Sequence, residues 1–277
     1  MHPHFFEPFA LINPDVHTIP AVVSLPHSGM RLTEQMEKDL LPGTVLPNMD
    51  WYLPKLYVFL EEMGFTLLIN NMSRYVIDPN RSREETCGPS YQTCLVYTHT
   101  TQGQEMYRTQ PDAAEIARRT EECYLPYHAA LSAALSEKRR RFDTVYLFDL
   151  HSFGLPYGAD VILGDRFGAS CPSAFTCFLG GLFAQNGFTV KENEPFSGGY
   201  ITRHYGAQRG IYAVQIELWY RAYIEQREFG NEMFPAVDAA LFDSAQKRLK
   251  NVFSAVKETL LQSVKGRQMV CRSIFRL

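Results

Sequence analysis

Apolar and polar positions follow two periods along the chain, one typical of strands and one typical of helices. Short runs of apolar and β-branched residues predict buried strands over residues 21–25, 65–70, 74–78, 144–150, 188–193 and 212–218. Apolar residues spaced three and four apart predict helices over residues 51–64, 111–141, 173–187 and 237–264. Pro126 lies inside the second helical segment and is expected to interrupt or kink it. Strands that alternate with helices predict an α/β fold of three layers, α/β/α, around a mostly parallel sheet.

Three of the predicted strands carry ionisable residues at or near their ends. His27 follows the strand in AVVSLPHSG, His151 ends VYLFDLHS, and Glu217 lies in YAVQIEL. Neighbouring parallel strands bring their carboxyl ends to one edge of the sheet, where α/β proteins keep their sites. A catalytic zinc site takes about three ligands from histidine and carboxylate, and it needs a base beside the attacking water. These three residues are therefore candidates for such a site.

Asp149 and His151 stand two positions apart in FDLHSFG. On a strand, residues at this spacing point to the same side of the sheet. One interpretation is a histidine neutralised by a neighbouring carboxylate. The other is a metal-binding histidine whose ring is oriented by an acid. The pattern alone leaves both interpretations open.

The segment SRYVIDPNRSR concentrates arginines around a predicted transition from strand to loop. Its candidate binding residues are Arg74, Asn80, Arg81 and Arg83. A guanidinium group binds a carboxylate with two parallel hydrogen bonds, so the cluster suits a ligand that bears a carboxylate. The alternative is a solvated basic loop paired with Glu84 and Glu85.

Composition narrows the class of protein. A length of 277 residues suits one large α/β domain, residues 1–277. A formal net charge of −3 gives no electrostatic case for binding nucleic acid or an anionic membrane. The six cysteines are scattered without a CxxC pair, which favours reduced thiols in the cytoplasm. The N-terminus has no secretory pattern and no segment approaches the roughly 20 apolar residues of a membrane span, so we expect a cytoplasmic protein.

Several short motifs between residues 20 and 225 occur together: PHSG, NMDWYLPKLY, SRYVIDPNR, MYR, PYH, DLHS, PFSGGYITRHYG and QIEL. This set resembles the N-formylglutamate amidohydrolase family, which is similar to the zinc carboxypeptidase and aspartoacylase superfamily. The resemblance implies a phosphorylase/hydrolase-like fold with one catalytic zinc ion per chain. It also implies a small-molecule substrate, N-formyl-L-glutamate. The implied reaction is the hydrolysis of this substrate to formate and L-glutamate, a late step of histidine degradation.

The resemblance further implies metal ligands. His27 and His151 match the two histidine ligands of the superfamily, and Asp149 is expected to orient a ligating histidine. The first histidine of the superfamily belongs to an HxxE motif, but Met30 stands at the position of the glutamate, and a thioether is a poor ligand for a hydrolytic zinc. Asp50, in a matching Asp-Trp motif, is the candidate third ligand. The alternative for Asp50 is an ordinary helix cap.

Substrate and catalytic roles carry over in the same way. Asn80 and Arg81 match the pair that holds the substrate carboxylate in the superfamily. Arg74 matches an arginine near the scissile carbonyl, where it would stabilise the tetrahedral intermediate. Glu217 matches the glutamate that takes a proton from the attacking water and passes it to the leaving nitrogen. The alternative for Glu217 is a buried acid paired with Arg221 or Arg203.

The segment 195–206 is rich in glycine and aromatic residues and is expected to be a loop that covers a small substrate. Tyr200, Thr202, Arg203 and His204 are its candidate substrate contacts, with a plain surface loop as the alternative. His128, in PYH, is expected to be packed or capped on a helix.

Other enzyme classes lack their motifs. The chain has no GxSxG, GxGxxG or P-loop pattern. A metallophosphoesterase needs acid and histidine clusters for two metals, and Asp165 in GDRFG has no such companions. The remaining alternatives are a deacylase or carboxypeptidase acting on another N-acyl amino acid, and a carboxylate-binding protein without metal.

Overall fold

A computed structural model gives the fold and describes residues 7–84 and 87–274. A seven-stranded sheet crosses the molecule in the order β1-β3-β2-β6-β9-β7-β8. Its strands are β1 (Phe9–Ile12), β2 (Ala21–Leu25), β3 (Thr66–Asn70), β6 (Val145–Phe153), β7 (Val161–Gly164), β8 (Val190–Glu192) and β9 (Ile211–Trp219). The central strands β3, β2, β6 and β9 are parallel, whereas β1 and β7 pair antiparallel with β3 and β9. The strands β4 (Cys87–Gly88) and β5 (Val96–Tyr97) form a separate ribbon.

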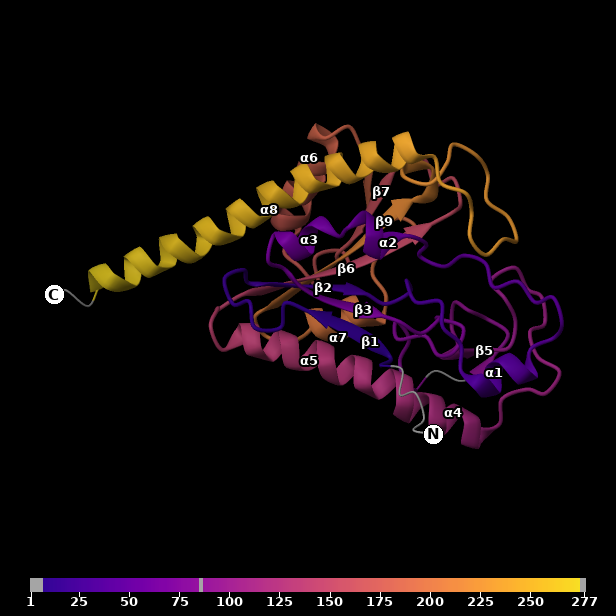
Figure 1. The fold of residues 1–277 in the computed structure, drawn as a ribbon. Coiled ribbons are helices and arrows are strands. Elements are labelled where there is room, and N and C mark those ends of the chain that lie inside the picture. The colour runs from indigo at the N-terminus through magenta and orange to yellow at the C-terminus, as the bar shows by residue number, and fades with distance from the viewer. Residues whose placement is uncertain (1–6, 85–86, 275–277) are drawn as a thin grey trace.

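Helices cover both faces of the sheet (Figure 1). The helices α5 (Leu125–Arg139) and α7 (Tyr200–Gly206) lie on one face, and α4 (Ala113–Arg119) prolongs α5. The opposite face carries α2 (Leu53–Leu56), α3 (Phe59–Glu62), α6 (Ser173–Gln185) and α8 (Ala239–Ile274), while α1 (Glu34–Asp39) lies beside β5. This is the three-layer arrangement, with a mainly parallel sheet, that the sequence predicted.

Apolar side chains fill the space on both faces of the sheet. Leu131 of α5 and Leu147 of β6 are buried in the core beneath α5 and α7. Leu249, Val252 and Phe253 of α8 are buried in the larger core on the other face. The spacing of three and four along α8 places these side chains on one stripe of the helix, as its sequence pattern predicted.

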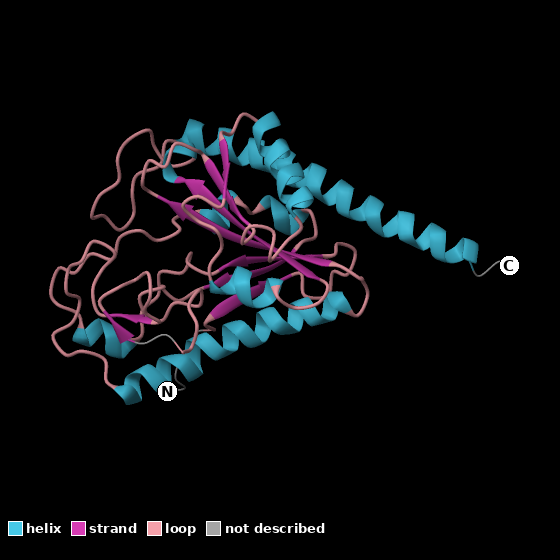
Figure 2. Cartoon of the chain, turned by 180° about the vertical axis from the view of Figure 1, so that it is seen from behind, coloured by secondary structure: helices cyan, strands magenta, loops and turns pink. Residues whose placement is uncertain are grey.

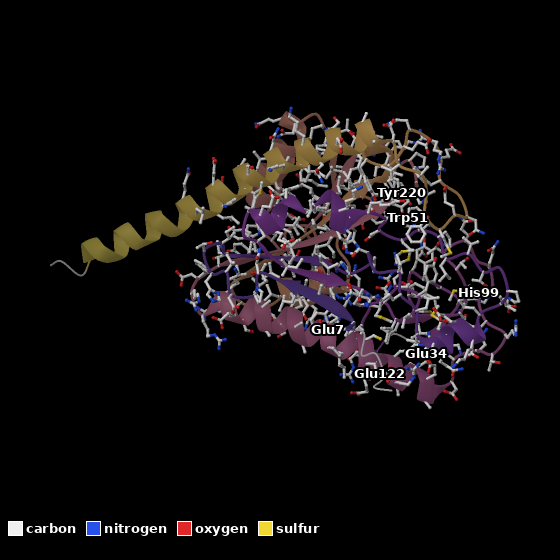
Figure 3. The ribbon with its side chains drawn as sticks, viewed as in Figure 1. Glu7, Glu34, Trp51, His99, Glu122 and Tyr220 are labelled. Carbon is white, nitrogen blue, oxygen red and sulfur yellow. The ribbon has the colours of Figure 1, made fainter. Side chains whose placement is uncertain are left out.

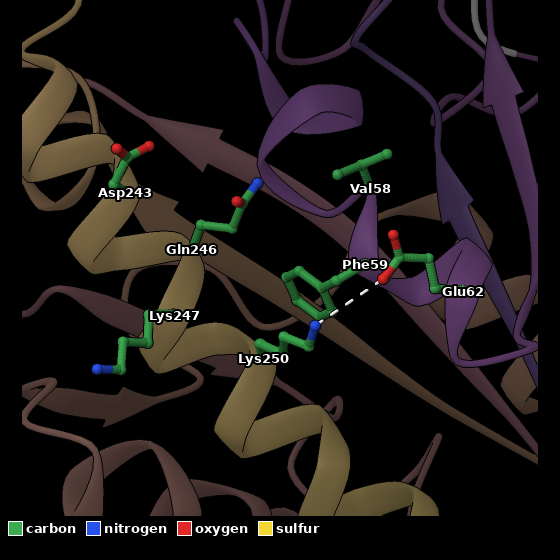
Figure 4. Close-up of a pocket in the computed structure, with 7 residues that line it drawn as sticks. All are labelled: Val58, Phe59, Glu62, Asp243, Gln246, Lys247 and Lys250. Atoms are coloured by element: carbon green, nitrogen blue, oxygen red, sulfur yellow. Dashed lines mark ion pairs between the residues drawn. The ribbon is translucent and has the colours of Figure 1, made fainter.

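The end of α8 extends away from the sheet, as the view from behind shows (Figure 2). In the part of the chain that the structure describes, no helix combines enough length with enough apolar surface to cross a membrane. A pocket lies where α8 crosses α3 (Figure 4), and Lys250 of α8 lies 3.9 Å from Glu62 there. None of the candidate site residues lines this pocket.

The helical segment 111–141 changes pitch before Pro126, which confirms the predicted interruption. A π-helical turn, Thr120–Tyr124, joins α4 to α5, and the Leu125 N–H donates to the Thr120 carbonyl. Pro126 then occupies the first turn of α5. Inside an α-helix, proline loses one backbone hydrogen bond, and its ring clashes with the carbonyl four residues earlier. The wider π turn before Pro126 reduces both costs.

Three local predictions were wrong, and two strands of the seven-stranded sheet were not predicted. Residues 74–78 form a turn instead of a strand, because the Val76 N–H donates to the Ser73 carbonyl (2.9 Å) and the chain bends over the end of β3. Residues 51–64 divide into the short helices α2 and α3. The strands β1 and β7 were not predicted. The expected loop 195–206 ends in α7, whose first turn packs against neighbouring loops.

Candidate active site

Three side chains from distant parts of the sequence meet at the carboxyl ends of β2 and β6. His27 follows β2, His151 lies in β6, and Asp50 lies in the loop before α2. The His151 Nδ1 atom lies 3.2 Å from His27 Nδ1 and 3.2 Å from Asp50 Oδ2, and His27 Nδ1 lies 3.8 Å from Asp50 Oδ2. All three residues are buried.

This geometry fits a metal ion. Bonds of about 2.0–2.2 Å in a tetrahedron place neighbouring ligand atoms about 3.3 Å apart, close to the observed separations. Within residues 7–84 and 87–274, Asp50 Oδ2 is buried and has no partner with hydrogen-bond geometry. A buried carboxylate oxygen without a partner is costly, and a cation between the three atoms would satisfy it. Two imidazoles and one carboxylate are also a common donor set of catalytic zinc.

Each histidine is held from behind by a carboxylate. His27 Nε2 lies 2.7 Å from Asp78 Oδ1, and His151 Nε2 lies 3.1 Å from Asp149 Oδ2. A carboxylate can only accept, so each Nε2 carries the proton and each Nδ1 directs its lone pair toward Asp50. Asn80 Nδ2 also lies 3.3 Å from His151 Nε2, and we assign the tautomer from the shorter contact with Asp149.

Asp78 was not predicted as a site residue. Besides His27, it accepts hydrogen bonds from Arg74 Nη2 (3.1 Å), from the Tyr97 hydroxyl and from the Asn80 N–H (2.7 Å). Burial alone would raise the pKa of Asp78, but His27 and Arg74 hold it well below its usual range. Its signal in the sequence is an aspartate two positions before Asn80, a spacing at which the side chain bonds the backbone two residues on.

The two histidines respond differently to their surroundings. Burial and the positive charge of Arg74 lower the pKa of His27 to about 4. Burial also opposes a charge on His151, yet Asp149 and Asp50 hold the pKa of His151 well above its usual value. The carboxylates around His151 therefore favour one positive charge at this point, carried by a second proton on the ring in the metal-free protein or by a metal ion in its place.

The loop that carries Asp50 aims its carboxylate at the histidines. Asp50 Oδ1 accepts hydrogen bonds from the backbone N–H and the hydroxyl of Ser152, both at 3.1 Å. Asn48 and Tyr52 on either side have φ angles of 56° and 62° in the left-handed region, so the chain bends sharply around Asp50. Tyr52 is the N-cap of α2 and no side chain caps this helix, so Asp50 is not a helix cap.

Glu217 lies in β9, opposite His151 in β6. The Gln215 side chain donates to Glu217 Oε1 at 2.8 Å. Burial raises the pKa of Glu217 to about 7; Asp50 adds to this rise and His151 opposes it. Arg221 lies 3.9 Å from Glu228, and Arg203 stacks over the Tyr200 ring, so these arginines have other neighbours. Glu217 is therefore a buried acid poised to gain or lose a proton near neutral pH.

The predicted arginine cluster divides into inner and outer members. Arg74 is nearly buried beside Asp78 and Tyr97, and its charge acts on His27 and Asp50. Arg81 donates from Nε and Nη2 to the Tyr91 carbonyl (3.2 and 2.6 Å) and from Nη1 to the Asn80 carbonyl (2.9 Å). Arg83 is exposed, and Glu85 lies outside the described residues. The inner members are thus ordered by protein contacts and are not a solvated basic loop.

The amino end of helix α7 contacts Asn80 and Gln215. The Gly199 N–H donates to Gln215 Oε1 at 2.6 Å, and the Ile201 N–H donates to Asn80 Oδ1 at 2.9 Å. A side chain at Gly199 would place its Cβ 2.3 Å from Asn80 Nδ2, so only glycine allows this approach. The amino end of α7 is therefore fixed beside Asn80 and the Glu217 strand.

The family model of the N-formylglutamate amidohydrolases matches residues 19–224. The chain belongs to this family. It is 34% identical over 225 residues to the N-formylglutamate deformylase of Pseudomonas aeruginosa, covering 76% of this chain and 84% of that relative. The N-formylglutamate deformylase of Pseudomonas putida is 33% identical over 223 residues, with the same coverage. The crystal structure of N-formylglutamate amidohydrolase from Ralstonia eutropha JMP134 superposes with a TM-score of 0.75 at 26% identity, covering 93% of this chain and all of that one.

The remaining predicted contacts on α7 lie in different environments. Thr202 is fully buried and its hydroxyl donates to Asp149 Oδ2 at 3.4 Å, so it faces away from solvent. Tyr200 is half-buried, and Arg203 and His204 are exposed. Tyr200 and Arg203 therefore remain candidates for contact with a ligand, whereas Thr202 supports the acid behind His151.

His128 and Asp165 make contacts that stabilise the fold. His128 Nε2 donates to the Pro79 carbonyl at 2.9 Å and its ring packs against Tyr124, which confirms a packed histidine. Asp165 accepts hydrogen bonds from the Gly168 N–H and the Asn193 side chain and so holds a turn. Among the described residues, His27, Asp50 and His151 are the only group of three or more His, Cys, Asp or Glu side chains placed to hold a metal ion.

Proposed function

We propose that this protein hydrolyses N-formyl-L-glutamate to formate and L-glutamate with one zinc ion per chain. The observation that carries the proposal is the convergence of His27 Nδ1, Asp50 Oδ2 and His151 Nδ1 beside Glu217. The names of the two Pseudomonas relatives supply the substrate.

His27, Asp50 and His151 would hold the metal, and Asp78 and Asp149 would fix the two imidazole rings. Zinc in such a site supplies Lewis acidity, which lowers the pKa of water and polarises a carbonyl group. The donor set favours zinc over magnesium or calcium, because imidazole nitrogen is a softer ligand than oxygen.

Glu217 would act as the base and then as the acid. It takes a proton from the attacking water and delivers it to the leaving nitrogen of glutamate, so that the C–N bond breaks and formate is released. A group that performs both transfers works best with a pKa near the working pH. Burial raises the pKa of Glu217 to about 7, which meets this condition.

Arg74 would stabilise negative charge on the formyl oxygen. Its guanidinium is nearly buried and is held by Asp78 and Tyr97, so its position is fixed before substrate binds. A positive charge placed in advance in a poorly solvated site stabilises a developing oxyanion strongly. Asp78 thereby links Arg74 to the metal ligand His27.

Asn80 and Arg81 would bind the α-carboxylate of the substrate. The contacts of Arg81 with the Tyr91 and Asn80 carbonyls fix the plane of its guanidinium. The Tyr91 carbonyl occupies the Nε–Nη2 edge, so a carboxylate would meet the Nη1–Nη2 edge, which is already oriented. Tyr200 and Arg203, on the outer side of α7, would contact the glutamate side chain, whereas Thr202 would support Asp149.

We also propose that the protein works in the cytoplasm, in histidine degradation, on a free small molecule. The net charge of −3 supports no role on nucleic acid or an anionic membrane.

The test is an assay of acid release by the zinc-loaded protein on N-formyl-, N-acetyl- and N-succinyl-L-glutamate. We expect the formyl substrate to have the highest kcat/KM. Faster cleavage of a larger acyl group would assign the protein to another deacylase activity. Absence of both turnover and bound zinc, with retained binding of a carboxylate ligand, would identify a metal-free binding protein.

A further inference from the structure

Three buried tyrosines form hydrogen bonds with the backbone of the loop that carries Asp50. Their hydroxyls donate to alternate carbonyls of the loop: Tyr75 to Pro47 (2.7 Å), Tyr220 to Met49 (2.9 Å) and Tyr223 to Trp51 (2.9 Å). All three tyrosines are at most 1% exposed. Figure 3 shows Tyr220 beside Trp51, and their ring centroids are 5.0 Å apart.

The central contact acts on the peptide bond that joins Met49 to Asp50. Its carbonyl accepts from Tyr220, and its N–H, which belongs to Asp50, donates to the His27 carbonyl at 3.2 Å. A peptide unit is planar, so bonds at both of its ends fix the plane and with it the direction in which the Asp50 side chain leaves the backbone. The same bonds tie Asp50 to the segment of the other ligand, His27.

The tyrosines stand on parts of the molecule that are themselves fixed to the site. Tyr220 begins a 3₁₀ turn, Tyr220–Ala222, that follows β9 directly, and β9 carries Glu217. Tyr75 lies in the turn that leads to Asp78, and its hydroxyl also accepts from the Thr101 N–H at 3.3 Å. The hydroxyl bonds therefore connect the Asp50 loop to the strand that carries Glu217 and to the turn that leads to Asp78.

Asp50 needs such support because its own loop does not provide it. The chain bends through left-handed residues at Asn48 and Tyr52; asparagine tolerates this conformation, but a bulky residue such as Tyr52 keeps it only when its surroundings hold it. Asp50 lies in the loop before α2, whereas His27 directly follows β2, so local chain geometry does not fix one side chain relative to the other. A ligand from a separate loop requires external contacts to face the histidines.

We propose that Tyr75, Tyr220 and Tyr223 are positioning residues for metal binding, which hold residues 47–51 so that Asp50 Oδ2 faces His27 and His151. This inference rests on the metal site of the proposed function. The hydroxyls do not touch the metal or the substrate; they act through Asp50.

The experiment compares Tyr220→Phe and the triple variant Tyr75→Phe, Tyr220→Phe, Tyr223→Phe with wild type. Tyr→Phe removes only the hydroxyl and leaves the ring. The zinc dissociation constant of each folded protein is measured by competition with a chromophoric chelator, and the melting temperature of each metal-free protein is measured alongside. The outer contacts of metal ligands are typically worth about 10- to 100-fold in affinity, so we expect a loss of this size in the triple variant and a smaller loss in Tyr220→Phe.

Tyr57→Phe is the matched control. Tyr57 is equally buried, and in the described part of the chain its hydroxyl has no hydrogen-bond partner. Its removal should leave the zinc affinity unchanged. The visible absorption of the cobalt(II)-loaded proteins gives a second readout, since a displaced carboxylate ligand changes the spectrum whereas a loss of stability alone does not.

Asp50→Ala separates failure of this inference from failure of the proposed function. If Asp50→Ala binds zinc as tightly as wild type, the proposed metal site is wrong and the inference falls with it. If Asp50→Ala weakens zinc binding but the tyrosine variants keep wild-type affinity and the wild-type cobalt spectrum, the tyrosines are structural only and the inference is overturned. If the triple variant does not fold, Tyr220→Phe alone decides by the same criteria.

Discussion

Glu217 stands opposite His151 in the register of the two central parallel strands, β9 and β6. The pairing puts a buried acid beside a histidine that points into the His27–Asp50–His151 cluster. Parallel pairing over all nine residues of each strand fixes this relation, so the position of Glu217 relative to His151 does not depend on a mobile loop. The fold itself therefore aligns the proposed base with the proposed metal.

Glu217→Gln should separate chemistry from binding. The amide keeps the size of the side chain and the contact with Gln215, but it cannot accept the proton. Loss of a general base costs about 10²–10⁴-fold in rate, so kcat should fall by that factor while bound zinc and KM for N-formylglutamate stay near wild type. Steady-state kinetics with elemental analysis of zinc measures both. Turnover within a few-fold of wild type would remove Glu217 from the mechanism.

His151→Ala should lose the metal. The variant keeps two of three ligands and leaves Asp50 and Asp149 without the cation or imidazole they face. Bound zinc, measured by elemental analysis after dialysis, should fall far below one per chain, because such sites need about three protein ligands.

The matched control is His99→Ala. His99 lies in a polar loop, 3.0 Å from the Thr98 hydroxyl, and is no part of the cluster. It should keep wild-type zinc. Stoichiometric zinc in His151→Ala would place the metal elsewhere.

The parallel strands β2, β3, β6 and β9 and the helical segments were predictable because each buries an apolar run whose period is visible in the sequence, whereas the short strands β1 and β7 were not predicted. The turn at Tyr75, Val76 and Ile77 has the same apolar composition and was read as a strand. These side chains are buried by loops at the edge of the sheet, and composition does not distinguish that environment from a strand. Segment 51–64 starts as a helix only after Tyr52, whose φ is in the left-handed region, and it divides at Tyr57, whose φ of −99° and ψ of 14° interrupt the helical conformation.

The candidate ligands were predictable for a different reason. His27 and His151 follow recognisable strand ends, so topology alone brings them together. Asp78 was missed because its partner His27 lies 51 residues away and only the fold reveals the contact. The three tyrosines that bond the Asp50 loop were missed for the same reason. In the sequence, a tyrosine whose hydroxyl bonds a distant loop looks the same as one that only packs in an apolar core.

His128 should make the protein less stable in acid. Burial lowers the pKa of His128 to about 4, whereas an unfolded histidine titrates near 6.5. The folded-state pKa is the lower one, so the stabilising effect is complete above pH 6.5 and is lost as the pH falls toward 4. At about pH 5 the linkage relation gives a loss of about 2 kcal/mol in the free energy of unfolding.

His128→Gln removes this titration, and its amide can still donate to the Pro79 carbonyl. Urea unfolding of the metal-free proteins at about pH 7.5 and pH 5 should show a smaller acid-induced loss in the variant, by about 2 kcal/mol. The proteins are metal-free because protons would otherwise compete with the metal for the other histidines as the pH falls. Equal losses in the two proteins would mean that His128 is not the titrating group.

Arg81→Lys should weaken recognition of the substrate carboxylate. In wild type we expect N-formylglutamate to be hydrolysed and its α-amide to be a poor substrate, because loss of a buried charged contact costs on the order of 2–5 kcal/mol. A lysine ammonium cannot reproduce the two parallel bonds of a guanidinium, and it also cannot bond the Tyr91 and Asn80 carbonyls together as Arg81 does. KM for the acid should therefore rise and the ratio of kcat/KM between acid and amide should shrink. The rival explanation is that Arg81 only holds the Tyr91 loop. In that case the variant would have a lower melting temperature and would keep the wild-type ratio, and the carboxylate site would lie nearer Arg203 on α7.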